Sequence, residues 1–248
     1  MTGELDSRRP QGEQIPDGWK PISPLDEEFK DFDQIRARIS REAEIDWVNS
    51  KKYETTVIDG FEDIFHKPLG SGFGGFNNTN FAVYQLIFAL SRSSHPAIAK
   101  LLSDGGSITS GDAIKMLRHK SVLKGLRVMD LGCSSLPAFA LAARSLGANV
   151  YTVDAQDIQA KYKDYLSGHT VLDLRDENAA EILRNNTGGG LDLMTEAIIG
   201  AGWDAPHNLK SPEAKTIIKI ADVLLKQGGY LYSQIFESSR VSALKKIG

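Results

Sequence analysis

The sequence has few of the features that mark specialised classes of protein. Its 248 residues include a single cysteine, Cys133, which excludes an intrachain disulfide. With only five histidines beside it, a zinc cluster is improbable, and we expect no metal site. Apolar runs fall far short of the about 20 residues that cross a bilayer, and the polar first residues lack the apolar core of a signal peptide. We therefore expect a cytoplasmic protein that does not contact membranes.

Positive charge is not in excess either. The chain carries 29 basic and 32 acidic residues, a net charge of -3, so it lacks the basic footprint of a dedicated nucleic-acid binder. Hydrophobic residues make up 41% and charged residues 25%, which is ordinary for a globular protein of this length. Nothing in these values indicates the oligomeric state.

Three segments differ in pattern. Residues 1–28 hold four of the nine prolines and are predicted to form a flexible arm. Residues 29–122 mostly show the three- and four-residue spacing of amphipathic helices, and we expect a helical region covering the acceptor side. Within it, the glycine-rich loop 70–78 suits either a lid, with Phe73 and Phe76 over a ligand, or a tight connection between helices.

From residue 123 to 248, short strand-like runs alternate with helical stretches. Strict alternation of this kind predicts parallel strands joined by right-handed crossovers, and hence an α/β, doubly wound, mainly parallel sheet. The expected strands are 126–130, 149–154, 169–173, 191–195 and 230–236. The expected helices are 137–146, 156–166, 176–184 and 211–226, and residues 238–246 could begin another.

Acidic residues end the first three of these strands. Asp130 precedes a turn at Gly132, where small residues let a ligand approach the backbone closely. Asp154 ends the second strand, 22 residues after Gly132, and a carboxylate there can accept hydrogen bonds from both hydroxyls of a ribose. Asp173 ends the third strand, at a height where a side-chain acceptor could receive an adenine amino proton. The pattern predicts a nucleoside cofactor at the carboxyl edge of the sheet.

The run LKGLRVMDLGCSSLPAFALAARSLGANVYTVD, residues 123–154, resembles the first two motifs of class I methyltransferases that use S-adenosylmethionine (SAM). The family pattern is an acid, a residue and then G-x-G-x-G; here only the first glycine is kept, with Ser134 and Leu136 in place of the others. The Gly228-Gly229-Tyr230 turn before the fifth strand is also similar to the family, and the resemblance covers residues 123–236, about half the chain.

This resemblance implies a Rossmann-like, SAM-binding core over residues 123–248 and a transfer of methyl from SAM. It implies that Asp130, Gly132 and Ser134 border the amino-acid end of SAM and that Asp154 binds the ribose. It also implies that Asp173 and Leu174 border the adenine. The full predicted cofactor set is Asp130, Gly132, Cys133, Ser134, Asp154, Ala155, Asp173, Leu174 and Glu196. Since the family sheet has seven strands and ends in an antiparallel hairpin, while this chain ends about one helix after the fifth strand, we expect the hairpin to be cut off, replaced or absent.

The acceptor is expected beside the fourth and fifth strands. The loop after the fourth strand holds three groups able to act on protons, Glu196, Asp204 and His207, of which Glu196 and His207 are the predicted catalytic residues. Either one could instead be a loop residue with no part in catalysis. The fourth strand lacks the (D/N)PP(Y/F) signature of amino-directed nucleic-acid methyltransferases, and no lysine-rich tetrad of RNA ribose methyltransferases is recognisable. We therefore expect a small-molecule acceptor, with the methylated atom undetermined.

Two other functions remain open at this stage. The irregular glycine motif is compatible with a non-catalytic, methyltransferase-like binding or scaffold protein. An NAD(P)-dependent oxidoreductase also places an acid after its second strand, but its fingerprint is G-x-G-x-x-G, and the window here reads Gly132-x-Ser134-x-x-Pro137. For Cys133, a nucleophilic role competes with that of a small buried turn residue.

Overall fold

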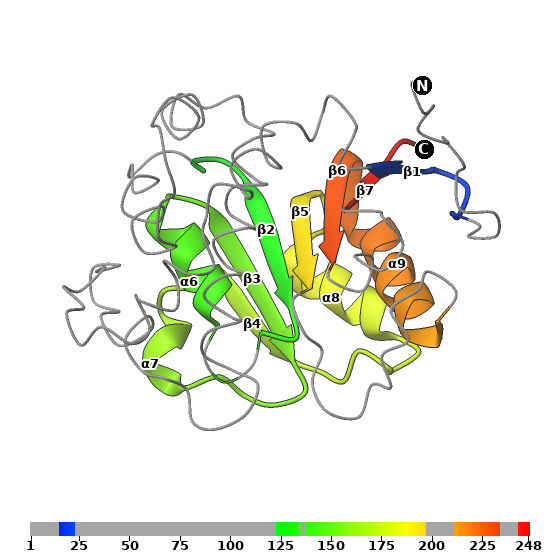
Figure 1. Cartoon of the computed structure of the whole chain (residues 1–248). Helices are drawn as coiled ribbons and strands as arrows, with labels where there is room; N and C mark the ends of the chain where they lie inside the picture. The colour runs from blue at the N-terminus through cyan, green and yellow to red at the C-terminus, as the bar shows by residue number, and fades with distance from the viewer. Residues whose placement is uncertain (1–14, 23–122, 134, 136, 197–210, 234–242) are drawn as a thin grey trace, which may run out of the picture.

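The structure is a computed structural model that describes residues 15–22, 123–133, 135, 137–196, 211–233 and 243–248. In this part of the chain, seven strands form one sheet in the order β1-β7-β6-β5-β2-β3-β4 (Figure 1). Strands β2 to β6 are mutually parallel, and β7 is antiparallel to both of its neighbours, β6 and β1. The strands are β1 (Trp19–Ile22), β2 (Arg127–Leu131), β3 (Asn149–Asp154), β4 (Gly168–Val171), β5 (Leu191–Glu196), β6 (Leu225–Ser233) and β7 (Ala243–Lys246).

Helices α6 and α7 lie on one side of this sheet, and α8 and α9 lie on the other (Figure 1). The chain runs outward from β2 to β3 and β4 and then crosses back to β5, on the other side of β2. The topological switch point is therefore between β2 and β5, the position where open α/β sheets bind ligands. The expected α/β sheet is confirmed at this level. The helices are α6 (Ala138–Ser145), α7 (Ala160–Lys163), α8 (Ala179–Thr187) and α9 (Pro212–Leu224).

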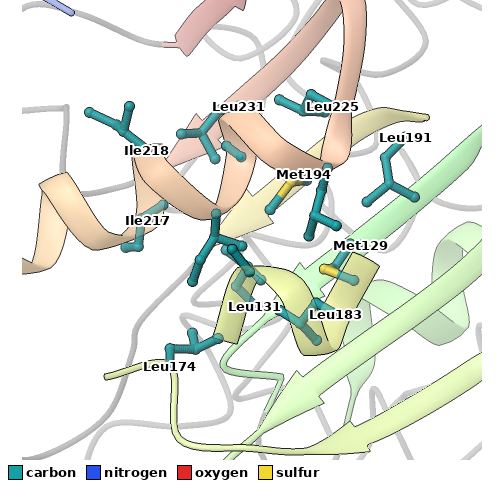
Figure 2. Packing of buried hydrophobic residues seen from close by; sticks show 14 of the residues in the cluster. Met129, Leu131, Leu174, Leu183, Leu191, Met194, Ile217, Ile218, Leu225 and Leu231 are labelled. Atoms are coloured by element: carbon teal, nitrogen blue, oxygen red, sulfur yellow. The ribbon is translucent and has the colours of Figure 1, made fainter. Parts of the chain in front are cut away.

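The main hydrophobic core lies between the sheet and the α8–α9 pair, as Figure 2 shows. Strand residues such as Met129, Leu131 and Met194 are fully buried there against Leu183 of α8 and Ile217 of α9. Each such side chain contributes about 1.5–3 kcal/mol relative to leaving it exposed. Because this core fixes β2, β5 and β6 against α8 and α9, the carboxyl ends of these strands have a rigid support.

Local sequence explains where α9 begins and why two glycines lie in β6. The hydroxyl of Ser211 accepts a hydrogen bond from the backbone N–H of Ala214 at 3.0 Å, and Pro212 occupies the first turn. The glycine pair expected before the fifth strand lies within β6: Gly228 has φ +78°, and a Cβ on Gly229 would lie 2.9 Å from the carbonyl oxygen of Lys226. Both positions therefore require glycine.

The N-terminal segment departs from the expected flexible arm. Within residues 1–28, Trp19–Ile22 form the edge strand β1, paired antiparallel with β7. Trp19 is 6% exposed and Ile22 is fully buried, because the apolar residues at the two ends of this short strand face the protein. The proline content of the arm concealed this pattern, since Pro21 lies inside the strand, where an edge position tolerates it.

The C-terminal segment also differs from the pattern that its sequence indicates. Residues 243–246, in the stretch that could begin another helix, form strand β7 instead, in which Ala243 and Leu244 are buried against β6. Of the alternatives expected for a C-terminal hairpin, which were that it is cut off, replaced or absent, the described strands match replacement: β7 pairs with β6, and β1 from the start of the chain takes the place beyond it. The helix expected over 156–166 shortens to Ala160–Lys163. The expected helical region 29–122, with the loop 70–78, lies outside the described residues.

Candidate functional site

The turn after β2 is fastened to the end of β3. Gly132 has φ +66°, a conformation that favours glycine, and its N–H donates to the carbonyl oxygen of Val153 at 2.9 Å. The N–H of Cys133 donates to the same oxygen at 3.3 Å. The turn therefore lies directly beside Asp154, the next residue of β3. The two features from which the sequence predicted a cofactor site are adjacent in space.

Asp130 is buried beneath this turn, with 4% of its surface exposed. It lies in register between Thr152 of β3 and Thr195 of β5, and the Thr195 hydroxyl donates to its Oδ1 at 3.4 Å. Burial raises the pKa of the Asp130 carboxyl to about 8; the Thr195 hydrogen bond opposes this, while the nearby Glu196 and Asp154 charges add to it. Asp130 is therefore mostly neutral at pH 7 and can donate as well as accept hydrogen bonds.

Glu196 ends β5, opposite Leu131 of β2. It is 1% exposed, and its Oε2 accepts a hydrogen bond of 2.6 Å from the hydroxyl of Ser233 on β6. Strand alternation explains this contact, because Glu196 and Ser233 are register partners on neighbouring parallel strands. The predicted catalytic carboxylate is thus held at the carboxyl edge of the sheet, and sequence reasoning missed its partner Ser233.

Asp154 lies half-buried at the carboxyl end of β3. Its Oδ1 accepts a hydrogen bond of 2.9 Å from the N–H of Gln156, two residues later, which bends the chain away from the strand. Its backbone carbonyl accepts from the N–H of Leu172 at 2.8 Å, which ties the ends of β3 and β4 together. Ala155, also in the predicted cofactor set, is exposed in this bend.

Asp173 follows β4 but is engaged by its neighbour. The guanidinium of Arg175 donates to the carboxylate from Nε to Oδ1 at 2.9 Å and from Nη2 to Oδ2 at 2.5 Å. These contacts hold the pKa of the Asp173 carboxyl at about 2. Leu174 is 4% exposed, and its side chain packs in the α8–α9 core. An adenine contact from Asp173 therefore requires the carboxylate to be shared between the adenine and Arg175. Leu174 can contact an adenine only through its backbone.

Cys133 is 6% exposed, and burial raises the pKa of its thiol well above its usual range. A neutral buried thiol is a poor nucleophile, so the structure favours the turn-residue interpretation.

Ser134, Asp204 and His207 lie outside the described residues. Among the residues that are described, no group of three or more His, Cys, Asp or Glu side chains could hold a metal ion, and no helix is long and apolar enough to cross a membrane.

Comparison with known proteins finds similarity among solved structures alone. No protein-family model matches the chain, and no curated protein is similar to it in sequence. Among solved structures, the chain is similar to the methyltransferase MycE from the mycinamycin biosynthetic pathway, in complex with Mg, S-adenosylhomocysteine (SAH) and mycinamycin VI. The TM-score is 0.37 and the identity 14%, and the match covers 60% of this chain and 38% of the other. The chain thus spans less than half of that neighbour, and a TM-score this low carries no argument about fold or function.

Proposed function

We propose that the chain is a SAM-dependent methyltransferase of the Rossmann-like class that acts on a small-molecule acceptor. The observation that carries the proposal is the fastening of the Gly132 turn to the end of β3, where the N–H of Gly132 donates to the oxygen of Val153 at 2.9 Å. This contact brings the glycine turn next to the carboxylate of Asp154, at the switch point of an open α/β sheet. A turn and an acid in this arrangement suit a nucleoside whose ribose lies over the end of β3.

The donor set fits the cofactor. Asp154 is half-buried and charge-bearing, which suits the two ribose hydroxyls, and Asp130 supplies a buried polar group beneath the turn at the amino-acid end. When bound, SAM supplies an activated methyl group on a sulfonium, so the chain's main contribution is positioning. The carboxylate of Asp154 orients the ribose, and the Gly132 turn admits the methionine part close to the backbone.

The acceptor is assigned to the edge formed by β5 and β6. Glu196 lies there, with Ser233 holding one of its oxygens at 2.6 Å. A carboxylate oriented in this way can take a proton from a hydroxyl or ammonium acceptor as the methyl group is transferred. His207, in the loop that follows β5 in sequence, is the second candidate for this role.

Calorimetric titration of the full chain with SAH, with NADH as the comparison, tests the proposal. We expect SAH to bind and NADH not to bind, because only the former matches a single-glycine turn preceded by an acid. Binding of NADH alone would support the oxidoreductase instead. Binding of neither compound would remove the nucleoside site and with it the proposed activity.

A further inference from the structure

His169 is a buried ionisable residue that the proposed function does not use. It lies on edge strand β4, opposite Thr152 of β3, and only 5% of its side chain is exposed. Its Nδ1 lies 2.8 Å from Oγ1 of Thr152, a residue that is itself 1% exposed. A ring this deeply placed on an edge strand, with a specific hydrogen bond, has one defined orientation.

The other ring nitrogen points to the loop that follows Asp154. Nε2 of His169 is buried and makes no aligned hydrogen bond, but it lies 3.4 Å from Oδ1 of Asp157. Asp157 is about half exposed and also pairs with Nζ of Lys163, in α7, at 2.6 Å. The carboxylate favours the ring proton on Nε2, which leaves Nδ1 to accept from the hydroxyl of Thr152.

These contacts form a row across the sheet that ends under the cofactor turn. Asp130, Thr152 and His169 are register partners on β2, β3 and β4. The thiol of Cys133, in the turn itself, lies within hydrogen-bonding reach of the Thr152 hydroxyl, whose oxygen can accept because its proton goes to Nδ1 of His169. His169 thus contacts, through Thr152, the turn predicted to hold the methionine part, and, through Asp157, the loop that continues from the ribose carboxylate.

We propose that His169 is a positioning residue for the cofactor site: it fixes the Thr152 hydroxyl under the Gly132–Cys133 turn and holds the Asp157 loop beside Asp154. This inference rests on the proposed function, since it concerns the geometry of the same site. His169 reaches the cofactor only through these neighbours and takes no part in methyl transfer.

Protonation of the ring would disturb this arrangement. A proton on Nδ1 turns the acceptor into a donor, so the Thr152 hydroxyl must reverse and leave its own proton without that acceptor. Burial lowers the pKa of His169, and Lys163 adds to this, whereas Asp157 and Asp154 oppose it. The ring is therefore neutral at neutral pH and becomes charged only on the acid side of the usual histidine range, where cofactor affinity should fall.

The test is the pH profile of SAH affinity, measured by calorimetry on the full chain from about pH 5 to pH 7, below the range in which Asp130 titrates. In the wild-type chain we expect a constant Kd near neutrality and a rise in Kd on the acid side. His169→Asn keeps an acceptor near the Nδ1 position but cannot become charged, so it should bind as wild type at neutral pH and lose the acid-side change. His169→Leu keeps the volume without the acceptor and should weaken binding about three- to tenfold at every pH, the scale of one hydrogen bond.

Thr170→Val is the matched control. Thr170 is the next residue of β4, faces the other side of the sheet and accepts a hydrogen bond from Asn186. Loss of the Thr170 hydroxyl should therefore leave the pH profile of SAH affinity unchanged. A wild-type chain that binds SAH with no pH dependence would overturn this inference and leave the proposed function standing. So would an unchanged acid-side profile in His169→Asn, or wild-type affinity in a folded His169→Leu chain. A wild-type chain that binds no SAH at any pH would overturn the proposed function itself.

Discussion

At the scale of single residues, Asp130 links the site to the stability of the fold. The pKa of its carboxyl rises from the ordinary value of 3.8 to about 8 on folding, so the folded chain retains a proton that the unfolded chain releases. For an acid with a raised pKa, the fold is favoured at low pH, and the free energy of unfolding decreases as pH rises between these two values. The burial that shapes the site thus destabilises the fold near neutral pH.

Asp130→Asn should remove this dependence, because the amide resembles the neutral acid and cannot ionise. Relative to wild type, the variant should become more stable as pH rises from about 5 to about 8, by up to about 1.4 kcal/mol per pH unit. Denaturant unfolding at several pH values measures this, with Asp164→Asn, an exposed acid, as the control. A stability difference that stays constant with pH would show that Asp130 is charged in the fold.

Asp154 is the residue through which the ribose contact is most directly tested. Asp154→Ala should weaken SAH binding by roughly 1–3 kcal/mol, the scale for losing hydrogen bonds to a charged group. Calorimetry measures the affinity, and Asp164→Ala, at the end of α7, serves as the control. Unchanged affinity in Asp154→Ala would remove this carboxylate from the site.

At the scale of elements, the edge of the sheet opposite the site is held by Arg127. Arg127 begins β2, and its guanidinium donates to the carbonyl oxygens of Thr187, the last residue of α8, and Gly189, in the turn that follows. Its backbone N–H donates to Oδ2 of Asp192 at 2.8 Å. Arg127 thereby links β2 to the end of α8 through its side chain and to β5 through its backbone. The forked guanidinium reaches two carbonyls at once, which a lysine ammonium does less well.

Arg127→Lys should therefore lower the free energy of unfolding by roughly 1–3 kcal/mol, since it leaves buried carbonyls less well paired. SAH affinity should not change, because the contacts lie at the amino edge of the sheet, away from the Gly132 turn. Chemical denaturation and calorimetry together check both statements. Weakened SAH binding with unaltered stability would contradict the claim that Arg127 stabilises the fold without affecting the cofactor site.

Strand β1 allows a second test at this scale. Ile22 is fully buried at the edge of the sheet, so Ile22→Ala should destabilise the chain by about 2–5 kcal/mol. Lys20→Ala, in the same strand at an exposed position, should have little effect. Thermal unfolding distinguishes the two. Equal, small effects would show that residues 19–22 do not pack as an edge strand in solution.

At the scale of the whole molecule, the sequence predicts the parallel part of the fold better than its edges. β3 occurs at the predicted bounds, Asn149–Asp154, because its apolar alternation and terminal acid are local signals. The sequence does not predict β1, a four-residue strand whose pairing partner, β7, lies more than 200 residues away. It does not predict β7 either, because this four-residue strand is held between β6 and the distant β1. Such pairing depends on tertiary contacts that no local pattern records.

The same contrast holds for the site. Acids at strand ends were recognisable, and the structure brings Asp130 and Asp154 together at the Gly132 turn. The sequence does not reveal the hydroxyls that bind the site carboxyls, Thr195 with Asp130 and Ser233 with Glu196, because their role depends on the strand order β6-β5-β2-β3. Polar residues at the ends of buried strands were the available signal. Likewise, the involvement of Asp173 with Arg175 depends on rotamers that spacing alone does not determine.

The central claim is that a nucleoside cofactor binds where the β2 turn meets the end of β3. Hydrogen–deuterium exchange of the full chain with and without saturating SAH locates the site directly. The account predicts slower exchange in peptides covering 130–135 and 153–159, and no change at 187–192, on the opposite edge of the sheet. Exchange in 130–135 and 153–159 that is unaffected by saturating SAH would contradict it.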